Sequence, residues 1–327
     1  TKHYDRPSPE RDLAASYAPI LLCDVQEPFK PLVAGYTVFR ASARSASAHR
    51  YVQLDKAGNP KADTVIEYAI WWDWDIGHLY ELEHIWVYLN GNGEVVYAEG
   101  SRHGRYLKML AAGEVPLTGQ RLTLFCEAGK HGFAPTRSWL ERVAPVTRKL
   151  CTRHAGLEGV LITWLFRGII RAKTPESDRL VHTYLERHAF EPSLEFPQVH
   201  PITPDSLVPW QALFEWIPWR VAWWVSQLRQ AITPAQRRLL RIAERSPSAD
   251  APENTLAAIV KAAELGADLV KLDVQHSEDG TPVIAPGAGA SDRDSGQGAA
   301  PQHTQADLQG PDVHGGGMAS TLEQAIA

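Results

Sequence analysis

The chain has 327 residues, which suggests two domains, and its 44% hydrophobic and 22% charged residues are ordinary for a globular protein. Its net charge of -5 argues against nucleic-acid binding, which requires a basic face, and no apolar run reaches the roughly 20 residues of a membrane span. The three cysteines, Cys23, Cys126 and Cys151, form no disulfide framework, so we expect a cytoplasmic protein.

Residues 1–135 are predicted to form an antiparallel β-sandwich domain. Short runs of β-branched and aromatic residues occupy positions 69–72, 84–89 and 94–98. The sequence Asn90-Gly91-Asn92-Gly93 separates the last two runs and is typical of a hairpin turn.

The same domain holds the densest group of metal-ligand side chains in the chain, between positions 73 and 84. Alternate residues of a strand share one face, so Glu81 and Glu83 are expected to point the same way, with His78 reaching them from the preceding loop. With Asp73 or Asp75 nearby, this group suits an oxygen-preferring divalent cation such as Ca²⁺ or Mg²⁺. We therefore predict Asp73, His78, Glu81 and Glu83 as metal ligands, and the alternative is a hydrogen-bonded surface loop without a metal.

This stretch resembles the Gly-His-Arg-His-Asp-Trp-Glu-His motif of the necrosis- and ethylene-inducing toxin-like proteins. The matching residues are Gly77, His78, Glu83 and His84, with Glu81 where the family has aspartate. Residues 99–106 resemble the family's Ser-Ala-His-Gly segment and include His103. The resemblance implies a β-sandwich that binds a metal and docks on sphingolipid headgroups, although the family's usual secretion and disulfide are not evident here.

Residues 136–235 are predicted to form a helical connecting region. Positions 139–143 and 157–172 have helical spacing, whereas the proline-rich residues 191–209 predict an extended linker. Residues 210–241 again favour helix, with Pro218 and Pro234 as interruptions. The aromatic stretch from Trp210 to Trp224 predicts either a peripheral membrane contact or a helix packed between the domains.

Residues 236–327 begin with a strand, a helix and a second strand, the pattern of a βαβ unit. The first strand reads Ile242-Ala243-Glu244-Arg245-Ser246, Pro252-Glu253-Asn254-Thr255 follows, and the second strand ends in Lys271-Leu272-Asp273. This segment resembles the start of the glycerophosphodiester phosphodiesterase family, which has a TIM-barrel fold. After Ile284 the composition predicts loop or disorder.

The resemblance implies a role for each of these residues in phosphodiester hydrolysis. The family has histidine where this chain has Glu244, so Glu244 is the candidate base, and Arg245 is the candidate phosphate ligand. The family has two metal-binding carboxylates on the second strand, of which Asp273 remains, while Lys271 replaces the other and is a candidate phosphate-binding cation. A second catalytic histidine expected after Ile284 is absent, which predicts a degenerate site, the pattern of a pseudoenzyme.

A complete TIM barrel needs about 200 residues or more, so this segment is predicted to be a partial barrel. It must then pack on the N-terminal domain or be completed by another chain, as in a homo-oligomer.

The sequence leaves three functions open. The first is a phosphodiesterase of lipid metabolism that acts on glycerophosphodiesters or phospholipid headgroups, through Glu244, Arg245 and Asp273. The second is a non-catalytic lipid-headgroup-binding module that holds a metal in the N-terminal domain. The third is a metal-dependent hydrolase in that domain, with His103 or His131 as the acid or base. The overall expectation is an α+β, multidomain, cytoplasmic protein with a peripheral membrane contact.

Overall fold

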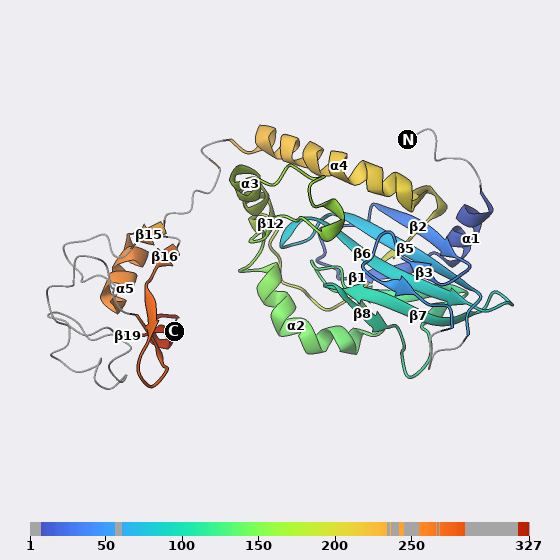
Figure 1. Cartoon of the computed structure of the whole chain (residues 1–327), viewed down its shortest axis with the longest axis horizontal. Coiled ribbons are helices and arrows are strands. Elements are labelled where there is room, and N and C mark those ends of the chain that lie inside the picture. The colour runs from blue at the N-terminus through green and yellow to red at the C-terminus, as the bar shows by residue number, and fades with distance from the viewer. Residues whose placement is uncertain are drawn as a thin grey trace. The chain divides into compact units, whose positions relative to one another are not determined.

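The computed structural model describes residues 8–55, 61–233, 236, 242–244, 255–265, 267, 269–284 and 320–326 (Figure 1). The chain divides into two compact units, Thr1–Arg238 and Leu239–Ala327. No described helix is long and apolar enough to cross a bilayer. The predicted division into three domains, 1–135, 136–235 and 236–327, stays a prediction.

The first unit is built on two β-sheets. The larger sheet, in spatial order, consists of β14 (Leu207–Pro209), β2 (Val33–Phe39), β5 (Thr64–Trp74), β6 (His78–Leu89), β7 (Val95–Arg102) and β8 (Arg105–Lys108), with β12 (Gly159–Val160) paired to β6. The smaller sheet consists of β11 (Phe133–Ala134), β10 (Arg121–Cys126), β1 (Ile20–Cys23) and β13 (Gln198–Pro201), with β9 (Leu117–Thr118) paired to β10. A separate short ribbon joins β3 (Ala43–Arg44) to β4 (Tyr51–Val52).

The predicted all-antiparallel arrangement is corrected by three parallel pairs. The strands β2, β5, β6, β7 and β8 are antiparallel neighbours, and the hairpin predicted at residues 90–93 joins β6 to β7. In contrast, β14 runs parallel to β2, β12 parallel to β6, and β1 parallel to β10. Two of these parallel strands come from beyond residue 135, where the sequence signals only helix or linker.

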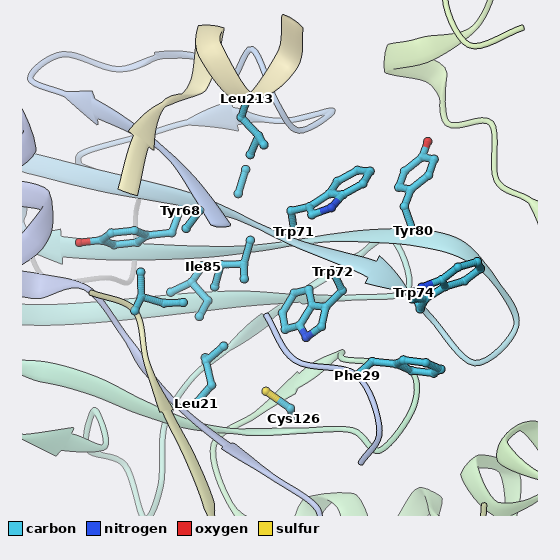
Figure 2. Close-up of a cluster of buried hydrophobic side chains, with 14 of the residues drawn as sticks. Leu21, Phe29, Tyr68, Trp71, Trp72, Trp74, Tyr80, Ile85, Cys126 and Leu213 are labelled. Carbon is cyan, nitrogen blue, oxygen red and sulfur yellow. The ribbon is translucent and has the colours of Figure 1, made fainter. Parts of the chain in front are cut away.

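Tryptophans of β5 fill the space on both sides of the larger sheet, because successive side chains of a strand point to opposite faces. Trp72 lies on the side of Leu21 and Cys126 of the smaller sheet, whereas Trp71 lies on the side of Leu213 of α4 (Trp210–Ala231) (Figure 2). Trp71 and Trp72 are completely buried. The β-strand tryptophans therefore belong to the core.

The connecting region contributes both helices and strands to the first unit. Helix α2 (Arg137–Cys151) confirms the first predicted helix, whereas residues 157–172 form β12 and the single turn η1 (Trp164–Phe166) instead of a helix. Other helices of this unit are α1 (Pro9–Tyr17), α3 (Pro175–Glu186) and the short η2 (Pro204–Ser206). The proline-rich segment is extended as predicted. Within it, β13 adds to the edge of the smaller sheet and β14 to the edge of the larger sheet.

Helix α4 packs on the larger sheet of the first unit (Figure 1). Its buried residues recur at helical spacing and include Leu213, Ile217, Val221 and Leu228. Pro218 lies inside the helix, so it does not interrupt it as predicted. Trp219 is 59% exposed on the opposite side, and contact of this helix with a membrane stays a prediction.

The second unit contains the predicted βαβ unit. Strand β15 (Ile242–Glu244) pairs in parallel with β16 (Leu269–Lys271), and α5 (Leu256–Glu264) connects them. Thr255 caps the helix, because its hydroxyl accepts a hydrogen bond from the backbone N–H of Ala258. The remaining described elements are an antiparallel sheet of β17 (Val274–His276), β18 (Pro282–Ile284) and β19 (Ser320–Thr321), and the helix α7 (Leu322–Ile326).

Candidate functional site

The candidate site lies where β6 changes its neighbour. At its start β6 pairs with β12 through His78 and Leu79, and β7 pairs with β6 only from Ile85 onward. Tyr80 has a left-handed φ of 61°, which breaks the regular pleat between these two pairings. Residues 80–84 therefore have no strand on this edge within the described part of the chain, and side chains can gather there.

Three side chains offer ligand atoms to one point. One oxygen or nitrogen from each of Asp75, His78 and Glu81 lies within 4.8 Å of the others. His78 Nε2 is 3.6 Å from Asp75 Oδ1 and 3.8 Å from Glu81 Oε2. His78 Nδ1 is 2.7 Å from the Tyr80 carbonyl, to which it must donate, so Nε2 of the neutral ring keeps its lone pair toward the carboxylates.

Burial favours the neutral ring, because it lowers the pKa of His78 below its usual value despite the nearby Asp75 carboxylate. A buried neutral imidazole beside two carboxylates is a donor set typical of a divalent cation.

Asp75 is held in place and still has an acceptor to offer. Its Oδ1 accepts hydrogen bonds from the Gly77 backbone N–H and from the Lys130 ammonium, both at 2.6 Å. Its Oδ2 is buried without a hydrogen-bond partner. A buried carboxylate oxygen without a partner is costly, and a cation that reaches Oδ2 would satisfy it.

Glu81 and Glu83 are close, as the strand alternation predicts. Burial, and then the neighbouring Glu83 carboxylate, raise the pKa of Glu81 well above its usual range. The carboxylate of Glu83 is already used, since it accepts hydrogen bonds from the Ser101 hydroxyl and from the His103 backbone N–H. Burial raises the pKa of Glu83, and the two hydrogen bonds oppose this shift. Glu83 therefore adjoins the three-residue cluster with its own oxygens already bonded.

Lys130 is the fixed cation of the site. Its Nζ lies 2.6 Å from Asp75 Oδ1 and 3.9 Å from Glu158 Oε1. Although burial disfavours the charged form, the Asp75 and Glu81 carboxylates raise the pKa of Lys130, so it stays protonated.

His103 faces the same cavity and is oriented by Glu127. Its Nε2 lies 3.0 Å from Glu127 Oε2, and 32% of its side chain is exposed. Glu127 is almost fully buried and also bonds Arg102 at 2.8 Å and the Thr147 hydroxyl at 2.6 Å. Despite burial, the His103 and Thr147 hydrogen bonds lower the pKa of Glu127, so a charged carboxylate supports the imidazole. The predicted alternative His131 is completely buried and stacks on Trp72 at 4.6 Å, which removes it from the candidate acids and bases.

These groups line a cavity of about 530 Å³. Its ionisable part consists of His78, Glu81, Glu83, Lys130 and Glu158. The other lining residues are largely aromatic, apolar or small, and they comprise Ser47, Ala48, His49, Leu82, His84, Ser101, His103, Gly104, Tyr106, Leu150, Leu161, Thr163, Trp164 and Leu165. The volume suits a small organic ligand.

Asp73 is not part of the site, which corrects its prediction as a metal ligand. Strand alternation puts Asp73 on the same face as Trp71, toward α4. There its two carboxylate oxygens accept hydrogen bonds from Arg220 at 2.8 and 2.6 Å, and Trp71 Nε1 donates to it at 3.1 Å. Asp75, two residues further along the chain, lies beside His78 instead.

The predicted residues of the second unit are only partly described. The parallel register sets the backbone of Glu244 opposite Lys271, which is exposed at the end of β16. Asp273 follows before β17. The side chain of Glu244 and the whole of Arg245 lie outside the described residues, so their predicted roles stay predictions.

Sequence reasoning missed three charged residues of the site. Lys130 and Glu127 lie in one turn after β10, where the sequence predicts a role only for His131. Glu158 precedes β12, about 80 residues from His78 in sequence, and no local pattern marks it. The pairing of β12 with β6 brings it to the site.

Residues 245–288 match the Glycerophosphoryl diester phosphodiesterase family. Glycerophosphodiester phosphodiesterase 1 of Rattus norvegicus is 51% identical over 55 residues, which are 17% of this chain and 16% of the relative. The glycerophosphodiester phosphodiesterase of Caldanaerobacter subterraneus subsp. tengcongensis is 51% identical over 47 residues, 14% of this chain and 19% of the relative. The chain thus spans less than a fifth of these relatives' lengths.

Two solved structures show a low similarity to the chain. A putative glycerophosphodiester phosphodiesterase from Galdieria sulphuraria is 24% identical with a TM-score of 0.24, covering 27% of this chain and 37% of that one. Necrosis and Ethylene inducing Protein 2 from the causal agent of cocoa's Witches Broom disease is 20% identical with a TM-score of 0.25, covering 41% and 70%. The family match over residues 245–288 agrees with the phosphodiesterase resemblance predicted for the C-terminal part.

Proposed function

We propose that the first unit is a β-sandwich module that binds a divalent cation through Asp75, His78 and Glu81, and uses it to hold a lipid headgroup. The observation that carries this proposal is the convergence of the three ligand atoms within 4.8 Å of one another, where His78 and Glu81 line an open cavity and Asp75 is completely buried beside them. The partnerless Asp75 Oδ2 supports it, because a bound cation would satisfy that oxygen.

The charges of the cavity favour a particular kind of headgroup. Asp75, Glu81, Glu83 and Glu158 carry four negative charges when ionised, against one positive charge on Lys130. A divalent cation would leave the site with a net charge of about -1 by this count. Hydroxyl groups that coordinate the cation, as on a sugar or polyol headgroup, suit such a site better than a phosphate does.

Calorimetric titration of the full chain with Ca²⁺, Mg²⁺ and Mn²⁺ tests the cation site. We expect one cation per chain for the unaltered protein and at least a tenfold weaker Kd for Glu81→Gln, because the variant loses one anionic ligand. The matched control is Glu114→Gln, an exposed carboxylate outside the cavity. Equal affinities for all three proteins would contradict the proposal.

A second candidate function, hydrolysis of a glycerophosphodiester by the second unit, is favoured by the family match over residues 245–288. In it Arg245 holds the phosphate, Glu244 accepts a proton, Asp273 binds a metal, and Lys271 adds a fixed positive charge. Turnover of glycerophosphocholine that requires Arg245 would support this function. Turnover that survives Arg245→Ala would exclude that residue as its phosphate ligand.

A further inference from the structure

One segment of the first unit concentrates positive charge in an otherwise acidic chain. Residues 142–173 contain seven lysines and arginines, namely Arg142, Arg148, Lys149, Arg153, Arg167, Arg171 and Lys173. Their single acidic residue is Glu158, so the segment has a net charge of +6. The whole chain has -5, which leaves -11 on the other 295 residues. Such segregation of charge indicates an anionic partner for this segment.

The first half of the segment presents a mixed basic and apolar stripe on α2. Arg142, Val146 and Lys149 are all exposed and lie three or four positions apart, so they share one face of the helix. Arg153 is exposed in the turn that follows the helix. Val146 is 60% exposed in the middle of this stripe, between the two cations.

The second half repeats the combination after β12. Trp164 is 52% exposed and Ile169 47% exposed, and the exposed Arg167 lies between them in sequence. Leu150 of α2 and Trp164 of η1 both line the cavity, so each half contributes to its wall. Exposed tryptophan and aliphatic side chains beside arginines are typical of surfaces that enter the headgroup region of a bilayer.

Most of these cations have no acidic partner of their own. Arg148 pairs with Glu191 at 3.0 Å and Lys173 with Asp178 at 3.1 Å. The other five form no ion pair with any residue in the described ranges. Their charge is therefore available to an external anion.

We propose that the 142–173 surface binds an anionic phospholipid bilayer. The basic residues supply attraction to the lipid phosphates, and Val146, Trp164 and Ile169 supply side chains that can enter the interface. The acidic remainder of the chain is repelled by the same bilayer, so binding would orient the first unit with this surface toward the lipid. The proposal does not require a metal in the cavity.

Co-sedimentation of the full chain with vesicles tests the proposal, with EDTA present so that metal-dependent headgroup binding does not contribute. We expect binding to vesicles of phosphatidylcholine mixed with phosphatidylglycerol, weak binding to phosphatidylcholine alone, and loss of binding at high salt. The double variant Lys149→Gln/Arg153→Gln should bind the mixed vesicles about 20- to 30-fold more weakly, since each basic residue contributes about fivefold. Trp164→Ala should weaken binding without changing its salt dependence.

The matched control is Arg40→Gln/Arg44→Gln, which removes the same charge from two exposed arginines outside the segment. Equal loss of binding in both double variants would overturn the proposal, because it would reduce the effect to net charge. Equal binding to both vesicle types, or retention on nucleic acid without vesicle binding, would also overturn it. Near-ultraviolet circular dichroism checks that each variant keeps its packed fold.

Discussion

At the scale of single residues, the partner of a charged side chain determines its role. Asp73 and Asp75 are two positions apart, yet one is bound by Arg220 and the other lies beside His78. The Asp73–Arg220 pair is largely shielded from water, with side chains 14% and 19% exposed. Removal of one partner of a largely buried ion pair lowers the free energy of unfolding strongly, because the remaining charge is left without a partner.

We therefore expect Arg220→Met to destabilise the first unit by about 2 to 4 kcal/mol, measured by urea unfolding. Arg229→Met is the control on the same helix, since Arg229 pairs with Glu176 in an exposed position. That change should cost less than about 1 kcal/mol. Similar losses for the two variants would show that the Asp73 pair is not a special feature of the fold.

A second prediction concerns Lys130, whose ammonium occupies one oxygen of Asp75. Without metal, Lys130→Met should lower the Tm, because the buried carboxylates then repel one another without a cation. A saturating divalent cation should restore much of that loss, since it replaces the missing positive charge. Thermal unfolding with and without Mg²⁺ measures this, and a Tm loss that metal does not reduce would argue against a cation between these carboxylates.

At the scale of elements, glycines shape the cavity wall between α2 and α3. Gly156 has a φ of 76°, and a Cβ there would lie 2.7 Å from the backbone Cα of His182. Gly168 has a φ of 80°, but nothing lies within 4 Å of its Cβ position. The first glycine is thus required by both conformation and space, the second by conformation alone.

We expect Gly156→Ala to destabilise the first unit by about 2 to 4 kcal/mol and to weaken metal binding, because the turn carries Glu158 and β12 to the site. Gly168→Ala should cost about 1 kcal/mol and leave metal binding unchanged. Urea unfolding and calorimetry of both variants check this. An equal loss of unfolding free energy in the two variants would contradict this, because it would mean that α3 shifts to accommodate the added Cβ at little cost.

The elements also show what the sequence could and could not predict. The hairpin at residues 90–93 and the βαβ unit depend on local signals, and both are correct. Residues 157–172 have apolar residues at helical spacing, but Gly159 and Gly168 adopt left-handed φ angles that a helix excludes. β12 then pairs with a strand about 80 residues earlier in sequence, which no local pattern specifies.

The same distinction holds for the site. Glu81 and Glu83 lie close together as strand alternation predicts, whereas His78 begins the same strand and not the preceding loop, and the left-handed Tyr80 interrupts the alternation between them. Asp73 was wrongly preferred to Asp75 because the partner that binds Asp73 lies on α4, 147 positions away in the chain. Lys130 and Glu158 reach the site only through tertiary structure.

At the scale of the whole molecule, the two candidate functions reside in different units. The cavity belongs to Thr1–Arg238, and the family match covers residues 245–288. Glu81→Gln should therefore weaken cation binding at least tenfold and leave any glycerophosphodiester turnover intact, and Arg245→Ala should abolish turnover and leave cation binding intact. Calorimetry and a glycerophosphocholine assay on both variants measure this, and loss of turnover in Glu81→Gln would contradict the separation.

Anomalous diffraction from crystals soaked in Mn²⁺ would show whether Asp75, His78 and Glu81 hold a divalent cation. We expect an anomalous peak within about 2.0 to 2.6 Å of one ligand atom from each of the three residues. The absence of a peak at this point in crystals soaked with Mn²⁺ would contradict the proposed site. A peak elsewhere, with Lys130 still bound to Asp75, would also contradict it.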